Sequence, residues 1–309
     1  MSTDTQRLTP RRFDRANMGV LAVQTVLWCC ALSVLSHSDV GAWKWLVLIA
    51  FCLMMQGVFS MMHEAFHDLA HSNRTTNYLM MWWASTLFGA SATLIHINHL
   101  GHHSRNRTHA ELADFALPGE SLLRKRVQYY FAILGGIWLA AFVGSLVIPL
   151  LPARITDRWA THGEANTYAA AFRDFSAGDF RRIRLETVAS LCVWLVAAAL
   201  FGWTLSGVLV AYSAFAFSWS SLQWVYHMRT PIDVVEGAYN LRAPRGVRWA
   251  FLNFNYNLTH HRHSDMHWQD MYRASNPEET RPLWFGWLQV FLPPQRLPED
   301  LTQLEKTYF

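Results

Sequence analysis

The sequence predicts an all-α membrane protein, in which four transmembrane helices form two hairpins and a cytoplasmic helical cap covers one end. Three observations predict this fold. Of the 309 residues, 52% are hydrophobic and only 16% are charged, a balance that is unusual for soluble domains. Four long runs contain almost no charge. All the histidines except His37 and His162 gather in three short regions beyond the ends of these runs.

The four apolar runs are read as membrane spans because about 20 apolar helical residues cross the hydrocarbon of a bilayer. None of them contains Asp or Glu, and Lys44 stands only at an edge. The third run is short and needs thin lipid or an anchor, for which Trp203 is suited. The first run is too long for a signal peptide and lacks a convincing cleavage site, so we interpret it as a retained anchor. The predicted spans are residues 16–35, 43–62, 187–203 and 206–226.

Two further apolar segments are not counted as spans. The segment 78–95 is short for a membrane span and is interrupted by Gly89, which favours an interfacial or re-entrant segment. Residues 127–151 are long enough to cross, but basic residues stand at both ends, which favours the same side of the membrane for both. Glycines and Pro149 make this segment easy to bend. We therefore expect it to form a helical hairpin that dips into the bilayer.

Basic residues before the first run place the N-terminus in the cytoplasm. With four crossings, all the clustered histidines reach the cytoplasmic face, and Lys44 is the only Lys or Arg outside. The predicted cap comprises residues 63–126, 152–186 and 227–309, and the chain is one integral-membrane domain, residues 1–309. We expect a multi-pass protein of a bacterial inner membrane.

The cysteines and the net charge carry less information. All four cysteines lie inside the runs and form no CxxC pair, so we interpret them as buried apolar residues. The net charge is +4, and the basic residues stand near the predicted edges of the membrane. For that reason we expect no nucleic-acid partner.

The first histidine cluster is HEAFH at residues 63–67. His63 and His67 are four residues apart and so share one face of a helix, which suits two ligands of one metal ion. Glu64 and Asp68 are suitable acceptors for the ring N–H groups of such ligands. His71, one turn further on, is either another ligand or an interfacial residue.

The second cluster is HLGHH at residues 99–103, in which His99, His102 and His103 can lie on one side of a helix. His96 and His109 flank it and are interpreted as outer or structural residues. The nearby carboxylates of Glu111 and Asp114 are placed to orient ligands.

The remaining histidines follow the last predicted span. A single residue, His227, stands at its end, on the face where the other clusters lie. A final cluster contains His260, His261, His263 and His267. At least two of its members are expected to be ligands, and the sequence leaves open which two.

Two other functions are compatible with parts of this pattern. His63 to His67 matches HExxH, in which two histidines bind zinc and the glutamate acts as a general base of a metalloprotease. A protease needs only one further ligand, however. A metal transporter would carry ionisable ligands near the middle of the membrane, whereas here the histidines stand at the ends of the runs.

Taken together, HEAFH (63–67), HLGHH (99–103), one histidine after the last span and NYNLTHH (255–261) resemble the membrane fatty acid desaturase family. This superfamily also includes hydroxylases and ketolases, and the resemblance covers roughly residues 43–270. It implies a non-haem di-iron centre of two Fe ions, with O2 as co-substrate, below which four helices span the membrane. The ligands that it implies are His63, His67, His99, His102, His103, His227, His260 and His261.

One position departs from the family pattern. The third box of the family is usually HxxHH or QxxHH, and here Asn257 stands first. Its side chain can coordinate through oxygen, act through water or leave a position open. Residues 262–265 (RHSD) also resemble the HSDHH box of membrane alkane hydroxylases, interrupted by Met266. That similarity keeps His263 and His267 as alternative ligands and keeps hydroxylation as an alternative outcome.

The resemblance implies a fatty acyl desaturase that forms a double or triple bond by C–H abstraction, with a lipid hydroxylase as the alternative. The acyl substrate would be carried by a carrier protein, coenzyme A or a lipid. No dinucleotide or iron–sulfur motif is present, so we expect a separate ferredoxin, rubredoxin or cytochrome as electron donor. Arg181, Arg182 and Arg184 are candidates for binding that donor or a substrate phosphate. Candidates for lining a substrate tunnel are Phe215, Phe217 and Trp219.

Overall fold

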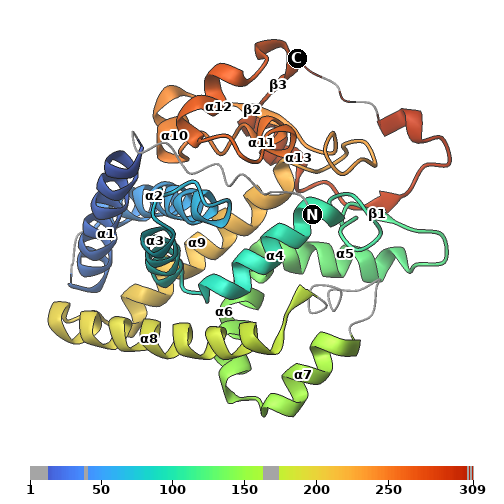
Figure 1. Ribbon diagram of the computed structural model, residues 1–309. Coiled ribbons are helices and arrows are strands. Elements are labelled where there is room, and N and C mark those ends of the chain that lie inside the picture. Colours follow the sequence, from blue (N-terminus) through green and yellow to red (C-terminus); the bar gives the residue numbers. More distant parts are fainter. Residues whose placement is uncertain (1–12, 38–40, 163–173, 305, 307, 309) are drawn as a thin grey trace.

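The computed structural model describes residues 13–37, 41–162, 174–304, 306 and 308 of the chain (Figure 1). These residues are mostly helical. Within them, five helical stretches are long and apolar enough to cross a membrane: α1 (Asp14–His37), α2 (Trp43–Phe66), the stretch Leu122–Leu150, α8 (Ala177–Phe201) and α9 (Leu205–Val225).

Shorter elements complete the described chain. Two pairs of very short parallel strands, β1 with β4 and β2 with β3, attach the C-terminal segment to earlier parts of the chain. The shorter helices are α3 (Arg74–Phe88), α4 (Ala92–Arg105), α7 (Ala153–His162), α10 (Arg245–Ala250), α11 (Asn257–Arg262), α12 (Trp268–Ala274) and α13 (Leu283–Gln289). The strands are β1 (Phe115–Ala116), β2 (Asn240–Arg242), β3 (Thr280–Pro282) and β4 (Gln295–Arg296), and the 3-10 turns are Pro277–Glu279 and Leu301–Leu304.

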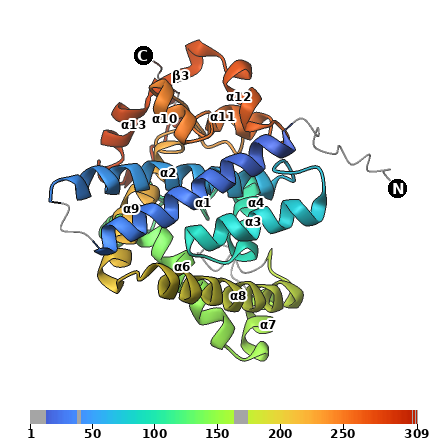
Figure 2. The same ribbon diagram turned by 90° about the vertical axis from the view of Figure 1, so that its left-hand side faces the viewer.

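Helix α2 lies at the centre of the molecule, and every residue from Met55 to Phe66 is buried. Helices α1, α3 and α9 pack around it, as Figures 1 and 2 show. A chain of hydrogen bonds joins the surrounding helices. The Trp28 indole of α1 donates to the Tyr212 hydroxyl of α9 at 2.7 Å, and this hydroxyl donates to the carbonyl of Leu87 in α3. The polar groups of Trp28 and Tyr212 are thus satisfied inside the bundle, where lipid would offer them no partner.

Four of the five long stretches agree closely with the predicted spans. The main difference is that α8 begins at Ala177, where Ser176 and Asp179 form a capping box, and not near residue 187. The fifth stretch is the segment for which we expected a dipping hairpin. The number of helices that cross the membrane, their pairing in hairpins and the side of the cap stay predictions.

Residues 127–151, for which we expected a dipping hairpin, form two helices on either side of a kink. Helix α5 (Leu122–Phe131) continues through a π-helical turn, Ala132–Gly136, into α6 (Ile137–Val147) and a final 3-10 turn. Gly135 adopts φ 125°, which residues with a Cβ rarely reach, and α5 and α6 leave it in different directions (Figure 1). The backbone of α9 at Ala216 and Phe217 passes close to this glycine. The kink therefore lies against α9, and the dip of this segment into the bilayer stays a prediction.

The apolar segment 78–95 is likewise divided between two helices. Gly89, with φ 90°, ends α3, and the Ser91 side chain caps the start of α4. The histidine box HLGHH therefore begins in the second turn of a helix that has a fixed starting point.

A buried carboxylate holds that starting point. Glu186 of α8 accepts hydrogen bonds from the Ser91 hydroxyl (2.6 Å), from both the amide and the hydroxyl of Thr93 (2.9 and 2.7 Å), and from the Tyr78 hydroxyl (2.8 Å). A negative charge at a helix N-terminus is also favoured by the helix dipole. Glu186 thus fixes where α4 begins and how it packs on α8.

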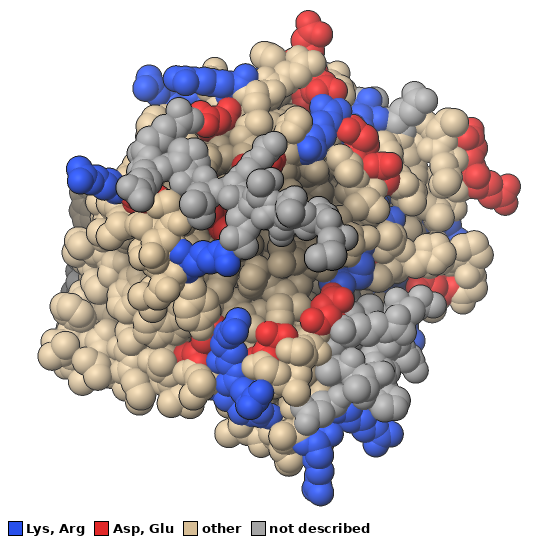
Figure 3. Space-filling view, viewed as in Figure 1, with Lys and Arg blue, Asp and Glu red and all other residues tan. Residues whose placement is uncertain are grey.

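The outer surface separates charged from apolar regions. In Figure 3 a broad area at the left, over α1 and α8, is almost free of Lys, Arg, Asp and Glu, whereas charges gather at the top and right. Val23 and Val26 of α1 and Leu195 and Leu200 of α8 are each at least 59% exposed. Apolar surfaces of this extent are expected to face lipid. The chain is an integral, multi-pass membrane protein.

We predict that Glu186→Ala destabilises the protein by about 3 kcal/mol, because three side chains would lose a buried acceptor. Thermal unfolding in detergent measures this loss. Glu186→Gln, which keeps one acceptor oxygen, should fall between the wild type and Glu186→Ala. An unchanged unfolding midpoint for Glu186→Ala would refute this role.

Candidate metal centre

Eight histidines that are far apart in the sequence meet beside the end of α2. Their ligand nitrogens form two groups, in each of which all the nitrogens lie within 4.8 Å of one another. We call them the five-histidine group (His63, His67, His99, His103 and His260) and the three-histidine group (His102, His227 and His261). Within the described residues these are the eight positions that the family resemblance implies as ligands.

Helix periodicity explains how the residues divide between the groups. His63 and His67 are one turn apart at the end of α2, and His99 and His103 are one turn apart in α4, so each pair shares a face. His102 precedes His103 by about 100° of helix rotation and faces the other group. The adjacent residues His260 and His261 of α11 likewise enter different groups.

The five-histidine group cannot be explained by hydrogen bonding among its members. Its Nε2 atoms lie 3.0 Å apart from His67 to His99, from His99 to His103 and from His103 to His260, and 3.1 Å apart from His260 to His63. Each ring nitrogen carries either a proton or a lone pair, so it can take part in one such hydrogen bond at most. Five nitrogens can thus form two hydrogen bonds, not four. A cation among them lets all five lone pairs point inward, and neutral imidazole is a preferred metal ligand.

The three-histidine group lies directly beside the first. The ring centroid of His102 is 4.8 Å from that of His227 and 5.3 Å from that of His261. The rings of His103 and His261, from different groups, are 4.9 Å apart. Eight imidazoles exceed the ligand number of a single ion, so the donor set fits two adjacent metal ions.

Burial favours the neutral form of His67, His103, His227, His260 and His261. Loss of hydration, reinforced by the neighbouring His103, lowers the pKa of His67 to about 3, and loss of hydration together with His102 lowers that of His103 to about 4. For His227, His260 and His261 burial lowers the pKa well below its usual value, and neighbouring imidazoles add to the effect. The residues are therefore in the form that binds metal at neutral pH, without first losing a proton.

Two members of the three-histidine group are oriented through their second ring nitrogen. His102 Nδ1 donates to Glu111 Oε2 at 2.5 Å, and Arg105 holds the other oxygen of the same carboxylate at 3.2 Å. His227 Nδ1 donates to the carbonyl of Gly237 at 2.9 Å. Each of these bonds places the proton on Nδ1 and leaves the Nε2 lone pair for a metal.

Asp114, which we expected to orient a ligand, acts on the backbone instead. It forms a buried ion pair with Arg107 (2.5 Å) and accepts from the amide of Arg229 at 2.6 Å. Arg107 also donates to the carbonyl of Thr230, whose hydroxyl donates to the carbonyl of His227. The pair thus fixes the segment that carries His227 rather than its ring.

The other histidines named from the sequence lie outside both groups within the described residues. His71 accepts from the amide of Asn73, and its ring is 3.7 Å from Asp14. His96 donates to the carbonyl of Phe66, and its ring stacks on the phenyl ring of the same residue. His263 is exposed at the end of α11, and His267 is buried against Phe13. His109 is not part of either group.

The acidic candidates near the first box and Asn257 differ in their surroundings. Glu64 is buried, accepts from the amide of Trp268 at 3.1 Å and lies 3.8 Å from His267. Asp68 accepts from Asn77 at 3.2 Å. Asn257 is buried at the start of α11, and its Oδ1 has no hydrogen-bond partner among the described residues. This oxygen is available to a ligand or to water.

The aromatic tunnel candidates belong to two different packing regions. Phe215 and Trp219 are buried on the side of α9 that faces α2, where Trp219 packs edge-to-face against Phe59. Phe59 in turn contacts Phe254, whose ring lies 4.8 Å from that of His63. Phe217 faces away and packs on Trp287 and Phe291 near α13. Aromatic rings thus lead from the histidines to Trp219, and Phe217 is not among them.

The three arginines proposed to bind a partner lie in the first turns of α8. Arg181 and Arg182 are exposed, and Arg182 lies over the ring of Tyr78. Arg184 donates to the carbonyl of Leu151 and to Thr156, which gives it a structural contact.

The sequence reasoning missed several residues that support the site. Glu186 stood at the edge of an apolar run, where a charge normally marks the end of a span. Nothing in the local pattern of Arg107 or Gly237 indicated a role, because their partners are distant in the sequence. Glu111 was suggested by its closeness to HLGHH, and its contact with His102 is present.

The comparison with protein families agrees with this geometry. Residues 41–287, most of the chain, match the profile of the family described as Fatty acid desaturase. The chain belongs to the fatty acid desaturase family. It is therefore a membrane oxidoreductase of that superfamily, and its histidine groups are able to bind metal. No curated protein matches the sequence.

We predict that Glu111→Gln weakens metal binding by the three-histidine group about tenfold, because the amide is a poorer acceptor for His102 Nδ1. Metal per chain after dialysis against graded chelator measures this. Glu120→Gln, which alters an exposed carboxylate paired with Lys125, is the matched control. If Glu111→Gln and Glu120→Gln retain metal equally well, Glu111 does not orient the ligand.

Proposed function

We propose that this desaturase-family protein is a fatty acyl desaturase that uses O2 and two iron ions to introduce a double bond into an acyl chain. The observation that carries this proposal is the convergence of eight imidazoles into two adjacent groups beside the buried end of α2. The proposed ligands are His63, His67, His99, His103 and His260 for one ion and His102, His227 and His261 for the other.

The reaction needs chemistry that no side chain provides. Two iron ions with O2 supply the oxidising power to remove hydrogen from an unactivated C–H bond. In the net reaction an acyl CH2–CH2 unit becomes CH=CH, and O2 is reduced to two waters. Two electrons and two protons come from outside the chain. We propose a separate ferredoxin-, rubredoxin- or cytochrome-type donor and a cytoplasmic orientation of the histidines.

The protein's own residues would hold the metal ions, orient the ligands and keep water out of the site. The packing of α2 and α4 positions the five proposed ligands that lie on these two helices or directly after α2. Glu111 and the Gly237 carbonyl set the tautomers of His102 and His227. The aromatic side chains of Phe59, Phe254 and Trp219 pack against one another beside His63. This apolar wall suits a hydrocarbon substrate and keeps water from the site.

The alternatives have less support. In a zinc protease Glu64 would face an attacking water, but its carboxylate accepts from the amide of Trp268, and three further histidines crowd His63 and His67. The similarity to the alkane hydroxylase box depends on His263 and His267, and neither belongs to the two groups. Hydroxylation of an acyl chain on the same scaffold is therefore tested as an outcome and not proposed.

The purified, membrane-extracted protein tests the proposal. We expect two irons per chain and, with a suitable electron donor, O2-dependent conversion of acyl lipids or thioesters. Mass spectrometry of acyl chains from cells with and without the gene should show loss of two hydrogen atoms. Gain of one oxygen atom would show that the enzyme hydroxylates its substrate and does not desaturate it. Zinc as the only bound metal would contradict the proposal.

We predict that His102→Ala abolishes turnover and lowers the iron content toward one per chain, because the three-histidine group then keeps two ligands. The variant should still be inserted in the membrane. Its matched control is His263→Ala, which removes an exposed imidazole outside both groups and should retain both irons. An active His102→Ala enzyme with its full iron content would contradict the ligand assignment.

A further inference from the structure

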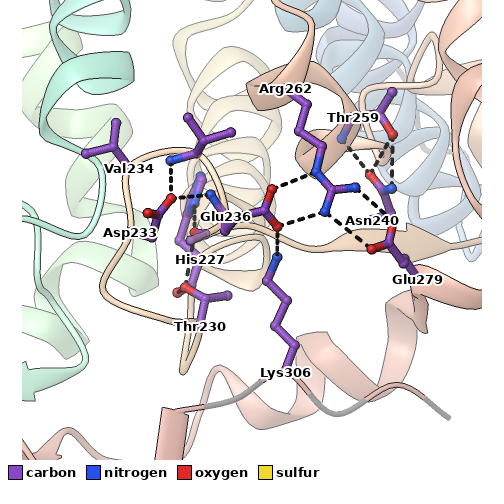
Figure 4. Close-up of polar contacts among 12 residues, drawn as sticks. His227, Thr230, Asp233, Val234, Glu236, Asn240, Thr259, Arg262, Glu279 and Lys306 are labelled. Carbon is purple, nitrogen blue, oxygen red and sulfur yellow. Dashed lines mark hydrogen bonds and ion pairs between the residues drawn. The ribbon is translucent and has the colours of Figure 1, made fainter. Parts of the chain in front are cut away.

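Arg262 follows directly after His261 and ends α11, and its guanidinium connects separate segments (Figure 4). Its Nε donates to Glu236 Oε1 at 2.7 Å and its Nη2 donates to Glu236 Oε2 at 2.8 Å, a bidentate pair. Its Nη1 also donates to Glu279 at 2.8 Å. Lys306 adds a second cation to Glu236 at 3.2 Å. Four charged groups from four parts of the chain therefore form one network.

Glu236 belongs to the loop that orients His227. Within this loop the Asp233 carboxylate accepts from the amides of Val235 and Glu236, which fixes the turn. The next residue is Gly237, whose carbonyl accepts from His227 Nδ1 at 2.9 Å and from the Thr230 hydroxyl at 3.0 Å (Figure 4). The position of Glu236 is thus tied to the orientation of the His227 ring.

One guanidinium consequently joins the segments that carry His261 and His227, two of the three members of the three-histidine group. The five-histidine group has a different support, because four of its members lie on α2, at its C-terminal end or on α4. We propose that the Arg262–Glu236 pair is a positioning clamp for the three-histidine group and determines how firmly that group holds its metal ion. This inference rests on the proposed two-metal function.

The clamp is accessible to salt. The side chains of Arg262 and Glu236 are 32% and 44% exposed. Single surface ion pairs contribute little, but bidentate geometry and membership in a network are the conditions under which they contribute measurably. Exposed charges are screened by added salt, whereas coordination by buried imidazoles is not. The clamp therefore predicts that salt loosens one half of the site selectively.

The test uses the full-length protein in detergent, loaded anaerobically with ferrous iron. Removal of iron by the chelator ferrozine is followed by absorbance, and the metal content is measured by mass spectrometry. We expect two phases, a faster one from the three-histidine group and a slower one from the five-histidine group. In Arg262→Gln and in Glu236→Gln the faster phase should accelerate about fivefold, and the slower phase should not change. High salt should accelerate the faster phase in the wild type and have little effect in these variants.

A double-mutant cycle separates a clamp from general destabilisation. Arg262→Gln combined with Glu236→Gln should release iron hardly faster than either single variant, because both remove the same contact. Glu120→Gln, which breaks the exposed pair with Lys125, should match the wild type. Equal acceleration of both phases, additive single effects or unchanged release in Arg262→Gln would each overturn the clamp. A wild type that binds no iron would instead overturn the proposed function.

Discussion

The proposed metal centre depends on one constraint: a ring nitrogen that binds a metal has a lone pair and no proton, so such nitrogens do not attract one another. The rest of the protein must hold eight imidazoles together beside the end of α2. Burial favours the neutral form, as the lowered pKa values of His67 and His103 reflect. Position is a separate requirement. The surrounding contacts supply it, because hydrogen bonds among the imidazoles can satisfy only some of their ring nitrogens.

The contacts that provide position act mostly one step away from the histidines. Glu186 fixes the start of α4 through three hydrogen bonds, and so fixes the height of His99 and His103 in the site; a fourth bond, from Tyr78, ties it to α3. The buried pair of Arg107 and Asp114 fixes the backbone that follows α9. Removing one partner of such a buried pair leaves an uncompensated charge, and so these residues are as difficult to replace as ligands. A histidine motif alone would not produce the site.

Local periodicity allowed the sequence to indicate the ligands, and distant docking explains what it did not indicate. The pairing of His63 with His67 and of the histidines within HLGHH follows from helix geometry, and four of the five long apolar helical stretches follow from apolar length. The division into five and three histidines depends on how α4 is rotated against α2 and where α11 docks, which no local pattern encodes. His263 was left open for the same reason. At this residue α11 has ended, and the side chain is exposed. The kink at Gly135 lies against α9, a contact between distant segments that the local sequence does not encode.

Under the proposed two-metal function, the two groups differ in a way that would matter for a reaction with O2 and a substrate. Four of the five histidines of the first group belong to α2, to the residue after it and to α4, whose packing changes only if the bundle changes. The three-histidine group draws its members from α4, a loop and a six-residue helix, with a partly exposed carboxylate, Glu111, behind one of them. Fewer ligands leave coordination positions open for exogenous molecules. Segments joined by exposed charges can also adjust at lower cost than packed helices. Both groups share α4 and α11, and the difference between them lies in the remaining members: the end of α2 supplies His63 and His67, whereas the turn after α9 supplies His227.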